Sequence, residues 1–253
     1  MFSYLKNNFN EFPDLFRESE RMLGHKYVIY GESPYMLIPN TFEELKKSRK
    51  RKTWYNIKRS RKLFEEKYGS LIFKIPSRNS EILRYLDKSY ELFNERWKEE
   101  YTSSDWKSSE KFEKYKDAMI SLNDANEGFL AVLTDSNDRL MAYGYCLKND
   151  STVYFYQHAS ISSAIYRDYS VGRIFLFELI KELVGKFKIL DFMLGRHQYK
   201  MEWASSSQII YKKIENGPLW ILRKLFWIII YNIRKNKFLH KFFRKLVSRF
   251  KTN

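Results

Sequence analysis

Only one cysteine, Cys146, occurs among the 253 residues, so no disulfide bond can form within the chain. A reducing compartment is therefore expected. The four histidines, at positions 25, 158, 197 and 240, are scattered, and a single cysteine cannot complete a zinc site with them. The sequence also lacks the GxxxxGKS/T phosphate loop, the GxSxG elbow and the HExxH motif. These absences disfavour metal and nicotinamide chemistry, and we expect no bound metal.

Long hydrophobic runs are absent as well. Between Lys224 and Arg234 stand nine uncharged residues, whereas about 20 are needed to span a bilayer. The first residues, MFSYLKNNFNEFPDLF, contain no apolar run followed by a small-residue cleavage site, so we expect no secretory signal. These patterns predict a cytoplasmic protein that can also lie at the inner face of the cell membrane.

Positive charge is concentrated in two segments that lack acidic residues. The net charge is +16; residues 46–62 hold ten basic side chains and residues 218–253 hold ten more. Elsewhere acidic residues slightly outnumber basic ones, so each segment by itself favours an anionic partner. Hydrophobic residues make up 44% of the chain and aromatic residues 18%, which is enough for a core and excludes wholesale disorder.

Hydrophobic periodicity predicts an α/β (α+β) protein with a mixed, mostly antiparallel sheet flanked by helices. Expected helices cover residues 14–23, 41–68, 80–97, 112–122 and 172–186. Expected strands cover residues 26–30, 71–75, 128–134, 139–147, 152–158, 188–194 and 207–214, with a turn at 31–34. Polar turns separate the three central strands, as in an antiparallel meander. A single βαβ crossover makes the strands at His158 and Asp191 parallel neighbours.

Three groups of residues carry a resemblance to a known family. They are Thr41-Phe42-Glu43-Glu44-Leu45 with Asn56-Ile57-Lys58-Arg59, the segment Ala164 to Gly172, and Leu190-Asp191-Phe192-Met193-Leu194-Gly195 with Tyr199-Lys200 and Trp203. In this order and spacing they resemble the GNAT acyltransferases. Within that family they are most similar to the cellulose-biosynthesis-type or BioF2-like acetyltransferases, which are related to the FemAB aminoacyl transferases.

The resemblance implies a GNAT-like fold and three parts of the chain. Residues 1–40 would be a short remnant of a preceding GNAT-like unit. Residues 41–215 would be the acyltransferase domain, including a basic helical arm at 41–68, and residues 216–253 a basic amphipathic tail. In that tail Phe238, Leu239, Phe242, Phe243, Leu246, Val247 and Phe250 share one helical face. The tail would bind an anionic membrane surface, or pack on the domain with its basic face in water.

The resemblance also implies acyl-CoA, most simply acetyl-CoA, as co-substrate. The family pattern Gln/Arg-x-x-Gly-x-Gly/Ala is matched by Arg167, Ser170 and Gly172, with Ser170 in place of a glycine. Helix N-termini bind phosphates through free N–H groups, so Val171 and Gly172 would hold the pyrophosphate while Arg173 adds charge. The alternative is an ordinary serine-capped helix.

GNAT chemistry needs a base that keeps the amine neutral and an acid for the leaving thiolate. His158 suits the base, since an unperturbed imidazole has a pKa of about 6.5. Asp191, on the next strand, is a second catalytic candidate, and Tyr199 at the family tyrosine position would protonate the thiolate. Lys200 and Trp203 would hold the acceptor or brace the cleft. The structural alternatives are a hydrogen-bonded histidine, an aspartate anchored to a backbone N–H or to Lys200, and a packed tyrosine.

We therefore expect an N-acyltransferase that moves an acyl group from acyl-CoA to an amine, such as an amino sugar or a precursor of a cell-surface polysaccharide or lipid. Two alternatives stay open: a FemAB-like transferase that uses aminoacyl-tRNA, and a non-enzymatic GNAT-like module that binds membranes. Residues 46–62 would contact coenzyme A phosphates, anionic lipid or tRNA, with Trp54 and Tyr55 able to stack on bases, or would form a solvated helix face.

Overall fold

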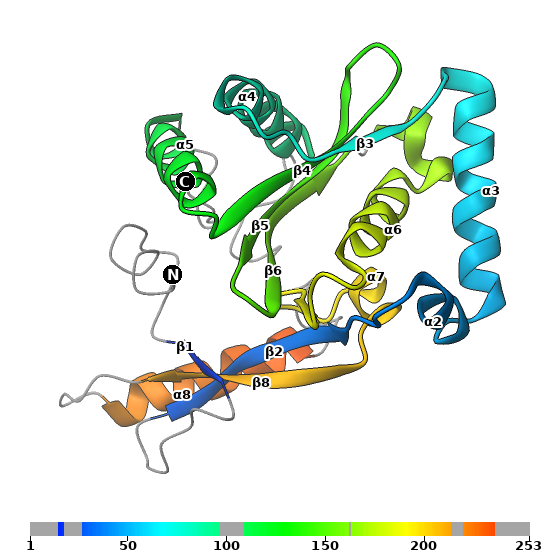
Figure 1. Cartoon of the computed structure of the whole chain (residues 1–253). Coiled ribbons are helices and arrows are strands. Elements are labelled where there is room, and N and C mark those ends of the chain that lie inside the picture. Colours follow the sequence, from blue (N-terminus) through cyan, green and yellow to red (C-terminus); the bar gives the residue numbers. More distant parts are fainter. Residues whose placement is uncertain (1–14, 18–26, 97–108, 162, 214–219, 236–253) are drawn as a thin grey trace. The chain divides into compact units, whose positions relative to one another are not determined.

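The computed structural model describes residues 15–17, 27–96, 109–161, 163–213 and 220–235. The chain forms two compact units, and both are built from separated stretches of sequence. The larger unit comprises residues 35–193 and 202–205, and the smaller unit comprises residues 1–34, 194–201 and 206–253. Figure 1 labels the helices and strands along the chain.

The sheet of the larger unit has the strand order β2-β7-β6-β5-β4-β3. Its strands are β3 (Ile72–Lys74), β4 (Gly128–Thr134), β5 (Leu140–Lys148), β6 (Thr152–Ser160), β7 (Ile189–Asp191) and the last residues of β2 (Tyr27–Leu37). These neighbours are antiparallel except β6 and β7, which are parallel. The expected mixed, mostly antiparallel sheet is thus confirmed, together with its central meander and its parallel pair.

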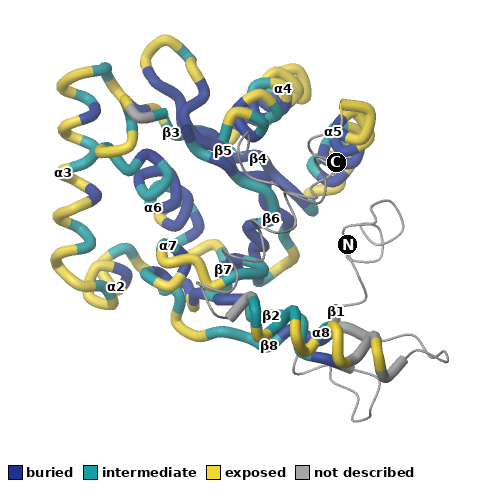
Figure 2. The backbone as a smooth tube through the Cα atoms, turned by 180° about the vertical axis from the view of Figure 1, so that it is seen from behind, coloured by how far each residue is buried: buried dark blue, intermediate teal, exposed yellow. Residues whose placement is uncertain are grey.

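Helices cover both faces of this sheet. The helices of the larger unit are α2 (Phe42–Lys47), α3 (Arg51–Tyr68), α4 (Asn79–Arg96), α5 (Ser109–Asp124), the 3-10 helix η3 (Ala164–Tyr169) and α6 (Val171–Leu183). Tyr145 on β5 donates its hydroxyl to the Met119 carbonyl of α5 (2.6 Å), whereas the neighbouring Gly144 faces Phe175 of α6. Successive residues of a strand point to opposite faces, so α5 and α6 lie on opposite sides. Strand β4 is accordingly buried along its whole length (Figure 2).

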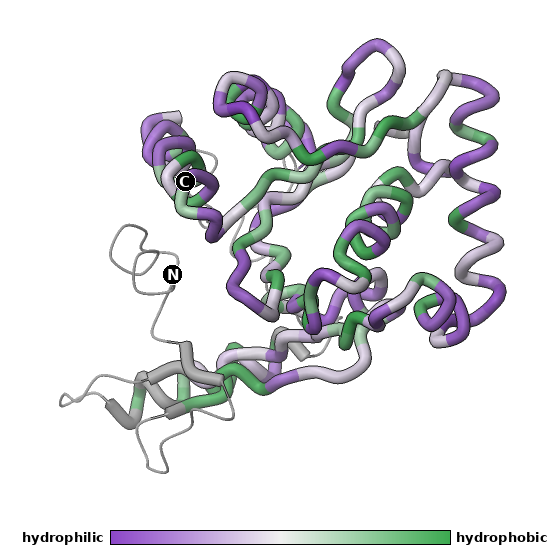
Figure 3. Tube along the Cα trace, in the orientation of Figure 1, coloured by the Kyte–Doolittle hydropathy of each residue, from purple (hydrophilic) through white to green (hydrophobic). Residues whose placement is uncertain are grey.

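Helix α3 packs outside α6 and carries six of the ten basic residues of segment 46–62. Arg61 ties it in place, because its guanidinium pairs with Glu178 of α6 (2.5 Å) and Glu65 (2.8 Å) and donates to the Leu71 carbonyl (2.8 Å). Apart from the buried Ile57 and Phe64, most of the helix is hydrophilic (Figure 3).

The expected single helix over residues 41–68 is wrong, because a turn at residues 48–50 separates α2 from α3. Lys50 is extended, with φ −62° and ψ 138°. Arg49 turns inward and donates from Nη2 to the Trp203 carbonyl (2.7 Å). Neither proline nor glycine marks this break, so the local pattern does not reveal it.

Three further expectations need correction. Residues 15–17 form the strand β1 (Leu15–Arg17) instead of part of a helix over 14–23. Residues 31–34 continue β2 instead of turning. The strand expected at 188–194 is shorter, since β7 ends at Asp191. For residues 15–17, the pairing with residues 210–212 of β8, far away in the sequence, explains the difference.

The smaller unit contains β1, β8 (Ser206–Lys213), the first part of β2, α7 (Gln198–Met201) and α8 (Trp220–Lys235). Strands β1 and β8 pair in antiparallel fashion, and β8 neighbours β2. Within the described ranges, no helix has both the length and the apolar character needed to cross a bilayer. The amphipathic face expected at residues 238–250 lies outside the described residues.

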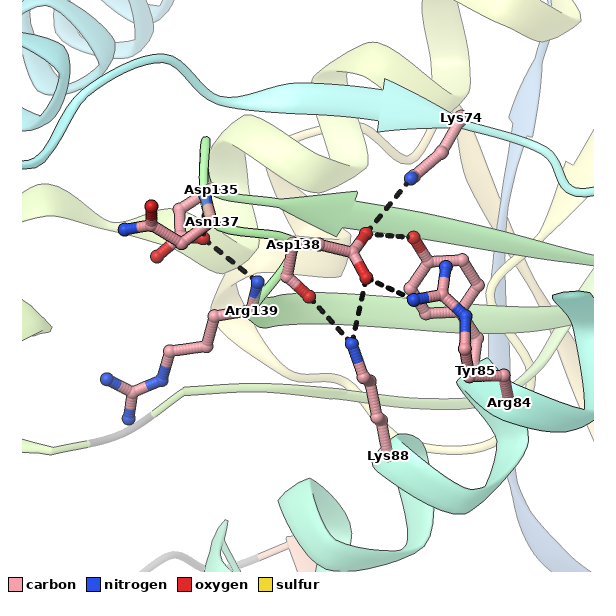
Figure 4. A network of polar contacts seen from close by, with 8 residues as sticks. All are labelled: Lys74, Arg84, Tyr85, Lys88, Asp135, Asn137, Asp138 and Arg139. Atoms are coloured by element: carbon pink, nitrogen blue, oxygen red, sulfur yellow. Dashed lines mark hydrogen bonds and ion pairs between the residues drawn. The ribbon is translucent and has the colours of Figure 1, made fainter.

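A charged network centred on Asp138 fixes the turn between β4 and β5 (Figure 4). The Asp138 carboxylate pairs with Lys74 (3.2 Å), Lys88 (2.9 Å) and Arg84, and accepts the Tyr85 hydroxyl. Burial alone would raise the pKa of Asp138, but the hydrogen bonds from Tyr85, Lys88, Lys74 and Arg84 outweigh it and hold this pKa well below its usual range. The network joins the turn to β3 and α4.

Candidate functional site

Strand β6 has a long edge that β7 leaves unpaired. The two strands pair only over residues 152–154 of β6, and the last pair joins Tyr154 to Asp191. Strand β6 then continues to Ser160, roughly 20 Å further at about 3.3 Å per residue. Among the strands that the structure describes, none other pairs with this edge. Residues 156–158 are also partly exposed. The edge of a strand that does not face a neighbouring strand is the kind of surface to which an extended ligand can add.

A β-bulge lies where the pairing with β7 ends. The register between β5 and β6 shifts between Tyr145 and Cys146, which leaves Tyr156 as an extra residue on β6. Bulges bend a strand, re-aim its side chains and are frequent beside active sites. His158 follows the bulge and is partly exposed, and its ring stacks on Phe155 with a centroid distance of 4.2 Å. The bulge and this stacking together set the orientation of the predicted base.

Helix α6 begins at a residue with a left-handed backbone. Ser170, the N-cap, has φ 48° and ψ 45°, and its side chain makes no capping hydrogen bond. This conformation favours glycine, which the family pattern has at this position. The Ser170 carbonyl accepts the N–H groups of Arg173 and Ile174, whereas those of Val171 and Gly172 have no acceptor among the described residues. Such N–H groups at a helix start attract anions.

The start of α6 touches the end of β6. A Cβ atom on Gly172 would lie 2.8 Å from Ser160 Oγ, so the Ser160 side chain would have to shift, and 3.3 Å from Ser160 Cβ, which is a tight contact. Glycine therefore allows the helix to lie directly against the strand. The open edge of β6 and the free N–H groups of α6 thus belong to one region of the larger unit.

Two arginines flank this helix start, and they differ in their partners. Arg167, in the last turn of η3, is exposed, and no carboxylate among the described residues pairs with it. Arg173 pairs through Nη2 with Glu202 Oε1 at 2.6 Å. Arg167 is therefore the more available cation for an incoming phosphate.

Aromatic contacts hold η3 against one end of α3. Phe64 and Tyr68 contact Tyr166 and Tyr169, with ring centroids 5.0 to 5.9 Å apart. Arg51, at the other end of α3, lies about 26 Å from Tyr68 along the helix axis at about 1.5 Å per residue. The two ends of the basic arm therefore cannot contact the same small anion.

Asp191 is fully buried at the end of β7. Its Oδ1 accepts the backbone N–H of Met193 (2.8 Å), a residue with φ 60°. The carboxylate thus anchors the tight turn that follows the strand, which is the backbone role considered above as the alternative to catalysis.

Trp203 is 1% exposed and contributes to the core of the larger unit. Its ring lies 6.0 Å from that of Trp54, and the Arg49 guanidinium lies 5.7 Å from its centroid. Desolvation lowers the pKa of Arg49 in this setting. Trp203 is thus a packed core side chain that contacts α3 and the turn before it.

Tyr199 and Lys200 lie on α7 in the smaller unit. Burial raises the pKa of Tyr199 well above its usual range. Lys200 is 3% exposed, and its ammonium group donates to the Leu194 carbonyl (2.9 Å).

Three residues that shape this region were not recognised in the sequence. Ser160 receives the start of α6, Glu202 pairs with Arg173, and Arg49 packs on Trp203. Each contact joins residues that are distant along the chain, and no motif in the sequence signals it.

Comparison with known families identifies the class of this protein. Residues 49–201 match the family described as acetyltransferase (GNAT) domain. Because this match covers more than half of the chain, the protein belongs to the GNAT acetyltransferase family. The resemblance found in the motifs is thereby confirmed. No curated protein matches the sequence.

Solved structures share the fold at low sequence identity. FemX has a TM-score of 0.55 and 12% identity, over 88% of this chain and 70% of that one. The C-terminal domain of a putative lysylphosphatidylglycerol synthetase from Agrobacterium fabrum has a TM-score of 0.51 and 12% identity, over 79% and 64%. A conserved protein of unknown function from Bacteroides thetaiotaomicron VPI-5482 has a TM-score of 0.50 and 12% identity, over 76% and 64%. The chain thus spans less than two thirds of the length of the last two.

Proposed function

We propose that the protein is an N-acyltransferase that moves an acyl group, most simply acetyl, from acyl-CoA to an amine. The open edge of β6 beside the start of α6 is the observation that carries this proposal. The pantetheine arm of coenzyme A is extended and has amide groups that suit an unpaired strand edge. Its pyrophosphate suits the N–H groups of Val171 and Gly172, with Arg167 adding charge. The contact between Gly172 and Ser160 supports binding of one molecule across both features.

In the proposed reaction the amine nitrogen attacks the thioester carbonyl, the carbon–sulfur bond breaks, and the thiolate leaves with a proton. His158 would take the proton that the amine loses, and its partly exposed position beyond the bulge supports this role. Tyr199 would give a hydrogen bond or a proton to the thiolate. Asp191 would hold the end of β7, while Lys200 and Trp203 would brace the acceptor side.

The acceptor that we propose is an amino sugar, or another amine-bearing precursor of a cell-surface polysaccharide or lipid. Membership of the family supports an amine acceptor, and the finer choice follows the resemblance to the polysaccharide-associated branch. Acetylation of a panel of amino sugars and amino lipids, followed by mass spectrometry, would identify it.

A thermal-shift titration with acetyl-CoA, longer acyl-CoAs and plain CoA tests the donor. A ligand at 100 times its dissociation constant stabilises the folded state by about 2.7 kcal/mol. Arg167→Gln should weaken binding by about tenfold, since it removes one charged contact. Arg51→Gln is the matched control, because Arg51 is also exposed but lies far from η3 along α3. The absence of any stabilisation by all of these ligands would exclude acyl-CoA as the donor.

A second candidate donor is aminoacyl-tRNA, as in the FemAB-like alternative. One observation favours it: most basic residues of segment 46–62 have no acidic partner among the described residues. These residues are Lys47, Arg49, Lys50, Arg51, Lys52, Lys58 and Arg59. Tyr55 lies among them and is 61% exposed, so it is available for stacking on a base.

Filter binding of aminoacyl-tRNA at several salt concentrations separates the two donors. If this surface binds RNA, Arg51→Gln with Lys52→Gln should lower the slope of log K against log salt by about 1.4 to 1.8, at roughly 0.7 to 0.9 per phosphate contact. Arg167→Gln should leave that slope unchanged. Activity that survives ribonuclease treatment would rule out aminoacyl-tRNA as donor.

A further inference from the structure

Helix α8 presents an apolar stripe to solvent. Leu222, Leu225, Phe226 and Ile229 are 62%, 51%, 56% and 57% exposed. Their spacing of three, four and seven residues places them on one helical face. Figure 2 shows exposed segments along this helix. Large apolar side chains that gather on an exposed face mark an interaction surface more often than single exposed ones do.

Another face of α8 is already used within the smaller unit. Trp227 lies about 140° around the helix from Leu222, at about 100° per residue. Its ring contacts that of Tyr30 on β2, with a centroid distance of 5.4 Å. The face of α8 that carries Trp227 therefore packs on β2, and the stripe lies on a different face of the helix. The stripe is therefore not the face by which α8 packs on β2.

We propose that the stripe on α8 inserts into the interface of an anionic membrane. The charge of the surrounding segment argues for this occupant. Residues 218–253 hold ten basic side chains and no acidic one, and two basic pairs, at residues 223–224 and 234–235, occur within the sequence of α8. Two copies of so basic a segment would repel each other, whereas anionic head groups attract it. An anionic membrane thus offers an apolar interior for the stripe and negative head groups for the basic residues.

The length of α8 fits a helix that lies in the plane of the membrane. Its 16 residues extend about 24 Å, shorter than the hydrocarbon core of roughly 30 Å. Interfacial helices bury an apolar face to a depth of about 5–10 Å and keep basic residues at the head groups. This binding goes beyond the proposed acyl transfer and does not depend on it.

Co-flotation of the full-length protein with vesicles tests the proposal. Vesicles of phosphatidylcholine with one quarter phosphatidylglycerol should capture the protein at low salt, and neutral phosphatidylcholine vesicles should capture far less. Phe226→Gln with Ile229→Gln should lower the partition coefficient by about tenfold or more, because two apolar side chains no longer leave water. Leu83→Gln is the matched control, since Leu83 is an exposed leucine on α4 (39% exposed).

Both variants replace exposed side chains, so circular dichroism and the thermal midpoint should match those of the wild type. Failure of the wild-type protein to float with anionic vesicles would overturn the proposal. Equal capture of the wild type and the double variant would also overturn it, because the stripe would then contribute nothing. A wild-type dimer that the double variant dissociates, without vesicle binding, would instead assign the stripe to contact between copies.

Discussion

Tyr154 and Asp191 form the last pair between β6 and β7 and mark the point where these parallel strands part. Before this pair the strands form a closed ladder, and beyond it β6 continues alone. His158 lies four residues past Tyr154, so it is about 13 Å further along the strand at about 3.3 Å per residue. An aspartate so placed cannot orient His158 by direct hydrogen bonding. Asp191 therefore stabilises the end of β7, whereas His158 lies on the part of β6 that extends beyond β7.

The contact between Gly172 and Ser160 predicts a specific pair of variants. We expect Gly172→Ala to lower the free energy of unfolding by about 1–2 kcal/mol, because the overpacking cost of about 1–3 kcal/mol exceeds the gain in helix propensity. Ser160→Gly removes both atoms that the new methyl group would meet, so the double variant should recover much of this loss. Urea unfolding measures both values. A Gly172→Ala variant more stable than the wild type would contradict the close approach.

The left-handed backbone of Ser170 predicts opposite effects of two substitutions. Ser170→Gly should leave stability unchanged or raise it by up to about 1 kcal/mol, since glycine adopts φ 48° without steric cost and no capping bond is lost. Ser170→Val should lower it by about 1–2 kcal/mol, because a β-branched residue is strained there. Thermal unfolding and acetyl-CoA titration of both variants provide the measurement. Equal stability of the glycine and valine variants would show that this backbone is not left-handed.

The Asp138 network predicts a loss of stability in acid. The folded-state pKa of Asp138 is lowered, whereas an unfolded aspartate has a pKa of about 3.9. The contribution of the network is therefore complete above about pH 5 and is lost as the pH falls through 4 toward the folded-state pKa. Asn is the matched replacement, because both Asp and Asn tolerate the φ of 59° at this position.

At pH 7 we expect Asp138→Asn to cost about 1–2 kcal/mol, a modest value because the carboxylate is about one third exposed. The difference between wild type and variant should narrow below pH 4. Unfolding midpoints measured from pH 3 to pH 8 test this. A difference that stays constant over this range would mean that the charge of Asp138 does not carry the effect.

Much of the fold could be predicted from the sequence because the central elements have strong local patterns. The run GFLAVLT matches β4 at both ends, and the alternation of polar turns gives the meander. The break between α2 and α3 could not be predicted in this way. It depends on the contact of Arg49 with Trp203, which lies 154 residues further along the chain.

The candidate site was predictable only in part, because some of its contacts join residues that are distant in the sequence. The loop from Arg167 to Gly172 is a contiguous motif, so its place before α6 follows from the order of residues. The residues that contact this loop and the start of α6 are distant in the sequence. Glu202 forms an ion pair with Arg173, and Tyr68 packs on η3. The open edge of β6 is a property of strand pairing, and no residue type encodes it directly.

The raised pKa of Tyr199 predicts how its role depends on pH. Burial keeps the phenol protonated beyond the usual tyrosine range, which begins near pH 10. Such a phenol is a weak acid toward a thiolate but a steady hydrogen-bond donor. We expect Tyr199→Phe to lower turnover by the same factor at every pH from 6 to 10. A factor that shrinks toward pH 10 would indicate that the phenol titrates and that its pKa is not raised.

Substitution of His158 and Asp191 separates the base from the anchor. His158→Ala should lower turnover by about 10²-fold or more, as expected for loss of a general base, while the protein stays folded. Asp191→Ala should lower the free energy of unfolding by about 1–3 kcal/mol, because the partly buried Met193 N–H loses its acceptor. Asp191→Asn keeps an oxygen for that N–H, so it should recover most of the stability. If its turnover also recovers, the aspartate acts as an anchor; if the stable variant stays inactive, its charge takes part in catalysis. A His158→Ala variant with wild-type turnover would remove His158 from the mechanism.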